Sequence, residues 1–355
     1  MKSSRLLSVL TGIVLMCATA LSSAAPAAAP VAAAATEAAG ASASASAGAG
    51  RPGGTDRTDY FRVTLLGTGT PVPSATRAGY STLVEAGGQK LVFDFGRNVS
   101  VRLWQLRIPL GSVDAHFLTH FHSDHLVGLP DLWLTGWLRP PYGRRDRPMA
   151  LYGPAGTRAL AEGLRQAFAA DIAIRHKDEG SALTGITIDA HDVAPGVVYE
   201  KDGVRVTAFE NDHGDHIRPS YGYRIDYRGR VVVLSGDTRF SPAVVAQARN
   251  ADVLVHCVTL IPDALLASNP AYRAIYDHLS SPEDAARVFQ AAAPKLAVFS
   301  HIGLNGDATV GQIVERVRKT YAGELLVGED LTRMEISLDG RTGTSGGIAV
   351  WQEKQ

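Results

Sequence analysis

Cysteine is almost absent from this sequence of 355 residues, which contains only Cys17 and Cys257. Cys17 lies in an N-terminal segment that we expect to be removed, and a single remaining thiol cannot form an intramolecular disulfide. The fold must therefore be stabilised by an apolar core and by any bound metal instead of cross-links. No activating partner for Cys257 is evident, so we expect a buried, inert thiol there.

An excess of either charge is also lacking, because 35 Lys and Arg residues balance 35 Asp and Glu residues. A protein that binds nucleic acid through its phosphates carries a basic footprint, and the overall composition shows no such footprint. The densest basic cluster, at residues 139–147, is interpreted as a solvated loop. On composition, nucleic acid is therefore not expected as a partner.

The N-terminus lacks an apolar run long enough to cross a membrane. Lys2 and Arg5 precede an apolar stretch that is short for a span, has no clear stop-transfer flank and ends in small residues near residue 25. This pattern is typical of a signal peptide over residues 1–25. We therefore expect a secreted or periplasmic protein with no stable membrane span.

The next segment, residues 26–55, consists mostly of Ala, Ser and Gly. Such a segment has little apolar surface to bury, so it is expected to be a disordered linker. Residues 56–355 remain, and their number suits one large domain or a domain with insertions.

Within residues 56–355, short strand-like segments alternate with helical ones. Two apolar segments flank Gly87-Gly88 and predict a β-hairpin, and Ser281-Pro282 has the pattern of a helix start. Strands mixed with helices in two similar halves predict two packed sheets covered by helices. The predicted strands are 61–66, 81–85, 90–95, 114–118, 204–209, 221–227, 230–234 and 296–299, and the predicted helices are 98–106, 126–138 and 154–170.

The strongest chemical signal is the segment THFHSDH at 119–125. His120 and His122 are two positions apart, so in an extended segment both rings point the same way. Asp124 and His125 follow where the chain turns into an apolar segment. Imidazole and carboxylate groups are ligands that Zn²⁺ accepts. Four such side chains in one short segment have no packing role, so a metal site is favoured over chance clustering.

Three later positions could complete this site. Asp237 follows an apolar strand in SGDT, and His301 ends another apolar strand in SH. Each of these positions alone is a weak indication of a metal ligand, because an Asp at the end of a strand usually forms a turn. One more metal ligand is needed, and we choose His213 from the segment NDHGDH. His216 of the same segment is the alternative, and it is otherwise interpreted as an ordinary loop histidine.

In their order, these motifs resemble the metallo-β-lactamase superfamily over residues 60–305. LVFDFG at 91–96 is similar to its first motif, in which Asp94 braces the histidine loop. LLGTGTPVPS at 65–74 and SYGYRI at 220–225 resemble the ribonuclease Z and exported arylsulfatase-like branch. The resemblance implies a hydrolase domain over 56–355 with the metallo-β-lactamase fold, an αββα sandwich of the α+β class.

The same resemblance implies two zinc ions per chain and a bridging water or hydroxide as the nucleophile. Asp124 would both ligate zinc and orient the hydroxide. The relatives also imply a homodimer by analogy. The implied ligands are His120, His122 and His213 for one ion and Asp124, His125 and His301 for the other, with Asp237 bridging them.

Two further histidines resemble the paired loops that overhang the ribonuclease Z site. His278 is our candidate for protonating the leaving group or contacting the developing anion, against the alternative of a plain loop histidine. His256 is a candidate catalytic residue that could equally serve only to support His278. The loops depart from the ribonuclease Z pattern at Cys257, where Glu is usual, and at Leu279, where Thr is usual.

The substrate expected from these features is a small exported ester. Ribonuclease Z commonly has a long basic arm for transfer RNA between the ligands that correspond to His213 and Asp237, and here that stretch is short enough for only a hairpin. We therefore expect hydrolysis of a phosphate or sulfate ester, by a phosphodiesterase-like or arylsulfatase-like enzyme. The alternatives are a lactone or β-lactam hydrolase, a ribonuclease Z-type endoribonuclease and a non-catalytic metal-dependent binding protein.

Overall fold

The computed structural model describes residues 59–339 and 347–353. The chain divides into two units, Met1–Gly53 and Gly54–Gln355, and everything described below belongs to the second. The expected signal peptide at 1–25 and linker at 26–55 lie outside the described residues. Among the residues that are described, no helix is long and apolar enough to cross a membrane.

The first sheet contains eight strands in the order β15-β14-β1-β2-β3-β4-β5-β6. Its strands are antiparallel from β15 to β3 and parallel from β3 to β6. The bounds are β1 Phe61–Gly67, β2 Ser81–Ala86, β3 Gln89–Phe93, β4 Ala115–Phe117, β5 Met149–Gly153, β6 Ile188–Asp192, β14 Thr332–Ile336 and β15 Ile348–Gln352.

The second sheet contains seven strands in the order β13-β12-β11-β10-β9-β8-β7. It repeats the same division, with antiparallel pairing from β7 to β10 and parallel pairing from β10 to β13. The bounds are β7 Gly196–Lys201, β8 Val204–Glu210, β9 Tyr221–Tyr227, β10 Arg230–Leu234, β11 Val253–Leu260, β12 Leu296–Leu304 and β13 Leu325–Val327.

The main core lies between the two sheets. Alternate residues of β1, such as Phe61 and Val63, share one buried cluster with alternate residues of β8, such as Val204 and Val206. This period of two follows from the pleat, which turns successive side chains to opposite faces. The Phe61 ring, for example, meets the Tyr227 ring edge-on, with centroids 5.9 Å apart.

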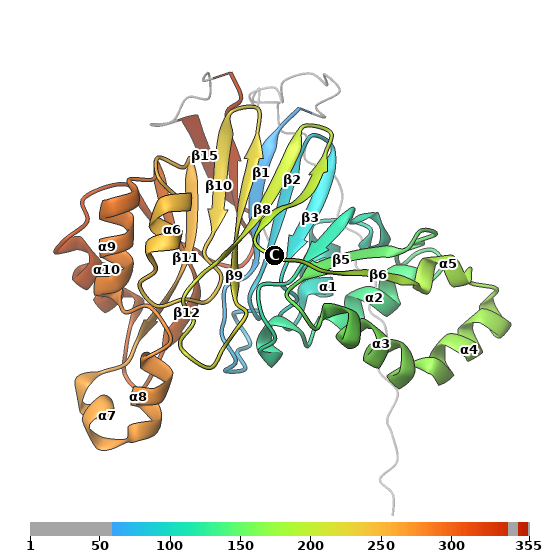
Figure 1. The fold of residues 1–355 in the computed structure, drawn as a ribbon, viewed down its shortest axis with the longest axis horizontal. Coiled ribbons are helices and arrows are strands. Elements are labelled where there is room, and N and C mark those ends of the chain that lie inside the picture. Colours follow the sequence, from blue (N-terminus) through green and yellow to red (C-terminus); the bar gives the residue numbers. More distant parts are fainter. Residues whose placement is uncertain (1–58, 340–346, 354–355) are drawn as a thin grey trace, which may run out of the picture. The chain divides into compact units, whose positions relative to one another are not determined.

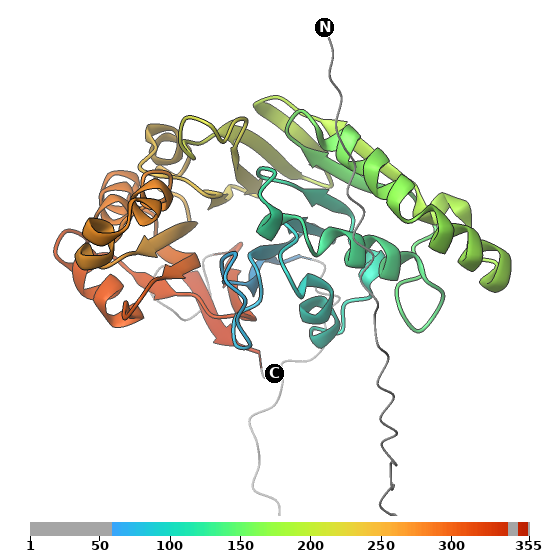
Figure 2. The same cartoon turned by 90° about the horizontal axis from the view of Figure 1, so that it is seen from below.

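Helices cover the outer face of each sheet (Figure 1). Two further apolar clusters form there, one under α1 and α2 on the first sheet and one under α6, α9 and α10 on the second. Figure 2 shows these two sets of helices on opposite sides of the sheets. The helix bounds are α1 Val99–Gln105, α2 Leu129–Trp137, α3 Thr157–Ala167, α4 Ala169–Glu179, α5 Leu183–Ile186, α6 Pro242–Gln247, α7 Asp263–Ser268, α8 Pro270–Tyr276, α9 Pro282–Ala292 and α10 Val310–Arg318.

The architecture confirms the expected αββα sandwich, and several local predictions are confirmed with it. β2 and β3 form the predicted hairpin. Ser281 caps α9 as its pattern indicates, since its side chain accepts a hydrogen bond from the Asp284 amide. The helix predicted over 154–170 is wrong in extent, because it is divided into α3 and α4 at Phe168, whose ring packs on Trp133.

In the second sheet, β12 is longer than predicted, and its neighbour β11 was not among the predicted strands. β12 continues beyond Phe299 to Leu304, so His301 lies inside the strand and not at its end. β11 contains His256. β12 extends beyond its predicted end because it continues to pair in parallel with β11 as far as Leu304, after a register shift between Cys257 and Val258.

Candidate metal centre

The histidine loop begins directly after β4. The chain leaves the sheet at Thr119, and residues Ser123–His125 form one 3₁₀ turn before α2. His120 and His125 are buried, and His122 is half-buried. The segment thus directs its imidazoles into the molecule, where they meet side chains from the loops after β8 and β10 and from β12.

A buried carboxylate, Asp94, holds this loop in place. It follows β3 with φ 57° and accepts hydrogen bonds from the Thr119 amide and hydroxyl, both at 2.8 Å. His125 Nδ1 donates to the same carboxylate at 2.8 Å. Because the Thr119 hydroxyl proton points to Asp94, its oxygen accepts from His120 Nδ1, 2.9 Å away. Asp94 thus engages Nδ1 of His125 directly and Nδ1 of His120 through Thr119, and Nε2 of each ring faces the candidate site.

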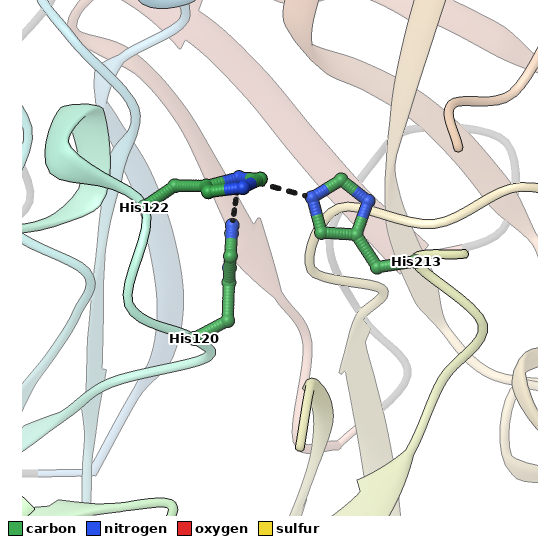
Figure 3. A group of neighbouring side chains, drawn as sticks. All are labelled: His120, His122 and His213. Carbon is green, nitrogen blue, oxygen red and sulfur yellow. Dashed lines mark hydrogen bonds between the residues drawn. The ribbon is translucent and has the colours of Figure 1, made fainter. Parts of the chain in front are cut away.

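The first group of candidate ligands is His120, His122 and His213 (Figure 3). His122 Nδ1 lies 2.9 Å from His120 Nε2 and 3.2 Å from His213 Nε2. His213 comes from the loop after β8, and its Nδ1 donates to the His278 carbonyl at 2.8 Å. The three nitrogens thus converge from two loops, with the other nitrogens of His120 and His213 engaged elsewhere.

The second group is Asp124, His125 and His301. Asp124 Oδ2 lies 3.2 Å from His301 Nε2 and 3.5 Å from His125 Nε2. His301 occupies the irregularity in β12 with a backbone φ of 46°, a left-handed conformation that residues other than glycine rarely adopt. This conformation interrupts the alternation of side-chain direction along β12 at the position where the His301 imidazole enters the site.

Asp237 lies between the two groups. Its Oδ2 is 3.4 Å from His125 Nε2, 3.2 Å from His301 Nε2 and 3.8 Å from His213 Nε2. It follows β10 after Gly236, whose φ of 61° and close approach to the Tyr221 carbonyl leave no room for a side chain. One carboxylate is thereby close to ligands of both groups.

The chemistry of these side chains fits metal ions. Burial, together with nearby imidazoles, lowers the pKa of His120, and burial lowers that of His213 to about 4, so both are neutral ligands. Burial would raise the pKa of Asp237, but the adjacent His301 and His125 hold it well below its usual range. Among the described residues, buried His125 Nε2 and Asp237 Oδ1 have no hydrogen-bond partner. Buried nitrogen and oxygen atoms that lack a hydrogen-bond partner can be satisfied by binding a metal ion.

A cavity of about 330 Å³ opens beside these ligands. His278, half-buried on the loop after α8, lines it. The centroid of its ring is 5.1 Å from that of His213 and 6.4 Å from that of His122. The structure thus brings His278 to the predicted site, within reach of a substrate bound there.

His256 is placed differently from the catalytic position we expected. It is buried on β11, its Nδ1 donates to the Cys257 carbonyl, and its ring meets Phe289 of α9 edge-on. It does not line the cavity, so packing under α9 is the role its position favours. Cys257 is also buried, and burial raises the pKa of its thiol to about 12, which makes it inert as expected.

Some residues of the site were missed by sequence reasoning. Thr119 was quoted within a motif without a role, although it links Asp94 to His120. Thr259 and Ile275 line the cavity without any signal in the sequence, and Leu279 lines it from the loop that the resemblance placed over the site. Only the close packing of separate loops makes these positions visible. His216, the alternative to His213, is exposed outside the two groups.

Two packed mixed sheets, covered by helices and bearing this ligand set, define a metal-dependent hydrolase of the metallo-β-lactamase fold. Residues 61–279 match the protein family described as anti-Pycsar protein Apyc1. Ribonuclease Z of Mycobacterium bovis BCG is 34% identical over 277 residues, which are 77% of this chain and 98% of that protein. The chain therefore belongs to the metallo-β-lactamase superfamily, in the Apyc1 family and among the relatives of ribonuclease Z.

Solved structures agree on the fold. The metallo-β-lactamase fold protein YhfI of Bacillus subtilis matches with a TM-score of 0.63 and 18% identity, over 78% of this chain and 100% of YhfI. The short form of human tRNase Z matches with a TM-score of 0.58 and 24% identity, over 78% and 99%. A diphosphatase of the PhnP family follows with a TM-score of 0.55 and 18% identity, over 78% and 98%.

Proposed function

We propose that this chain is an exported, zinc-dependent phosphodiesterase that holds two ions and acts on a small molecule. The observation that carries the proposal is the position of Asp237 Oδ2, close to His213 of one ligand group and to His125 and His301 of the other. A carboxylate there suits a pair of ions. Phosphate is favoured over sulfate because the relatives at 34% identity are ribonucleases, which cleave phosphodiesters.

Zinc, when bound, would supply an activated water and positive charge for the oxygens of the attacked ester. The chain's own residues orient the reaction. Asp124 both belongs to a ligand group and lines the cavity, so its carboxylate is suited to orienting the attacking water. His278, on the cavity wall, would donate a proton from its imidazole to the leaving oxygen.

A small substrate is favoured over transfer RNA. β9 and β10 form a tight antiparallel hairpin between His213 and Asp237, turning at Arg228-Gly229, and fill the stretch where an arm would be inserted. The overall charge is balanced as well. Export rests on the signal-like pattern of residues 1–25.

The test is a side-by-side assay of the zinc-loaded full-length chain with an aryl phosphodiester, an aryl sulfate, a lactone, a chromogenic β-lactam and precursor transfer RNA. We expect turnover of the phosphodiester, two zinc ions per chain by elemental analysis, and loss of both in Asp237→Ala. Preferred turnover of the lactone, the β-lactam or the RNA would replace the proposal with that activity. Two bound ions without turnover of any substrate would indicate a binding protein.

A further inference from the structure

The cavity beside the metal ligands has a second, apolar wall. Pro71 and Val72, on the loop after β1, Ile275 of α8 and Leu279 after that helix all line it. These side chains come from two segments far apart in the chain. They therefore form a surface that only the folded molecule creates, in the same cavity as the candidate metal ligands.

Two of these side chains are left in contact with solvent. Val72 is 67% exposed and Ile275 is 39% exposed, although both are aliphatic. A single exposed aliphatic side chain needs no explanation, but apolar groups that converge on one cavity indicate a surface that a ligand covers.

The cavity also lacks cationic side chains. Of the described residues that line it, none is Lys or Arg. Arg239, on the nearby loop after β10, is bound to Asp212 at 2.9 Å and to Asp215 at 3.2 Å. A substrate with several phosphates needs such cations, because charge-assisted hydrogen bonds are the strongest contacts that phosphate makes with protein. Among the groups at this cavity, the positive charge for a phosphate would come from the metal ions.

The apolar wall is held in place on the β1 side. The loop that carries Pro71 and Val72 runs from Thr68 to Ala78, and the amides at both ends donate to the buried Asp330 carboxylate. Arg102 pairs with the same carboxylate at 2.8 Å. Anchoring both ends of this loop limits the conformational entropy that it would lose when a substrate packs on Val72.

We infer that the substrate is a phosphodiester with a single negative charge and an apolar or aromatic group that packs on Val72, Ile275 and Leu279. This rests on the proposed function and adds the chemical class of the group that the enzyme recognises. The single phosphate would lie at the metal ligands, and the apolar group would cover the exposed wall.

The test compares two phosphodiesters that carry the same charge and the same leaving group. Bis(4-nitrophenyl) phosphate retains an aryl group on its phosphate, whereas methyl 4-nitrophenyl phosphate retains only a methyl group. With the zinc-loaded full-length chain, and with each kcat/KM divided by the rate with hydroxide, we expect the aryl diester to be favoured by about 10-fold or more. 4-Nitrophenyl phosphate, with two charges, should be the poorest of the three.

Variants locate the effect. Ile275→Asn and Leu279→Asn should lower kcat/KM for the aryl diester about 10-fold more than for the methyl diester, mainly through KM. Ile174→Asn is the matched control, because Ile174 is 65% exposed on α4 and lies outside the cavity. It should leave both substrates unchanged.

The outcomes separate the two proposals. Turnover of the diesters without preference for the aryl group, or a preference that Ile275→Asn leaves intact, would overturn the inference while the phosphodiesterase stands. Faster turnover of the doubly charged monoester would overturn the single-charge requirement. No turnover of any phosphodiester by a chain with verified zinc would overturn the proposed function, and the inference with it.

Discussion

His213 is held by the backbone of His278 and not by its imidazole: His213 Nδ1 donates to the His278 carbonyl at 2.8 Å. The loop after α8 therefore has two separate parts in the site. Its backbone orients a candidate metal ligand, and its side chain lines the cavity. Substitution of the side chain can separate these two parts.

The first prediction concerns that side chain. His278→Ala keeps the carbonyl that orients His213, so we expect zinc content to stay at the wild-type level. kcat for a phosphodiester with an alkoxide leaving group should fall by about 100-fold, the lower end of what a general acid contributes. The fall should be smaller for substrates whose leaving group needs no proton.

His216→Ala is the control for this variant, because His216 is an exposed histidine of the neighbouring loop. It should keep full activity. If His278→Ala lost zinc and activity in parallel, the side chain would be acting on the metal site and not on the leaving group.

The second prediction concerns Asp94, which lies behind the histidine loop and makes no contact with the cavity. Asp94→Asn leaves a neutral side chain opposite His125 Nδ1 and removes the charge that favours its donor form. We expect zinc affinity to fall by about 10–100-fold, as is usual for groups that orient metal-bound histidines. Competition with a chromophoric chelator measures this directly, and restoration of activity at high zinc would distinguish weak binding from misfolding.

The third prediction concerns removal of the metal. Asp124 Oδ2 and Asp237 Oδ2 both lie 3.2 Å from His301 Nε2, so without cations two carboxylates are crowded together in a buried site. A chelator should abolish activity and lower the melting temperature, and excess zinc should restore both. At free zinc of about 100 times Kd, the ion would add about 2.7 kcal/mol to the free energy of unfolding. An unchanged melting temperature after verified metal loss would contradict the assignment.

The fourth prediction concerns acid stability and a histidine outside the site. His116 is buried on β4, its Nδ1 donates to the Ala150 carbonyl, and burial, with Arg145 nearby, lowers its pKa to about 3. The unfolded chain takes up this proton near pH 6.5 but the folded chain does not, so the free energy of unfolding falls as pH drops from about 6.5 towards 3. At pH 5 the loss from this residue is about 2 kcal/mol.

His116→Gln keeps an amide donor and removes the titration. The difference in unfolding free energy between wild type and variant, measured with urea, should therefore shift by about 2 kcal/mol in favour of the variant between pH 7.5 and pH 5. Metal ligands titrate equally in both proteins and cancel in the difference. An unchanged difference would mean that His116 is not buried neutral in the folded state.

Much of the candidate site could be predicted because it is local. His120, His122, Asp124 and His125 are contiguous, so their direction follows from backbone geometry over a few residues. The hairpin of β2 and β3 and the start of α9 are also encoded by neighbouring residues, through Gly87-Gly88 and Ser281. Resemblance to known motifs then linked this loop to Asp94, His213, Asp237 and His301.

Other features could not be predicted, since they depend on which distant segments meet. His301 was expected at the end of a strand, but pairing of β12 with β11 extends that strand and places the imidazole at an irregularity inside it. His256 was expected beside His278, but the alternation of β11 turns it towards Phe289 under α9. Val72 and Leu279 lie in segments that the resemblance marked, but that these two side chains meet Ile275 in one apolar wall could not be predicted, because each alone is an ordinary aliphatic side chain.

The order of residues was thus sufficient to predict a metal-binding loop, the superfamily and the layered sheets, because side-chain periodicity and short motifs act over a few positions. Assembly of the two ligand groups around Asp237, and of the cavity beside them, required the packing of two sheets and of the loops at their strand ends. The physical reason is that pairing and burial between distant segments are cooperative. They determine where a strand continues, which face a side chain takes and which side chains become neighbours.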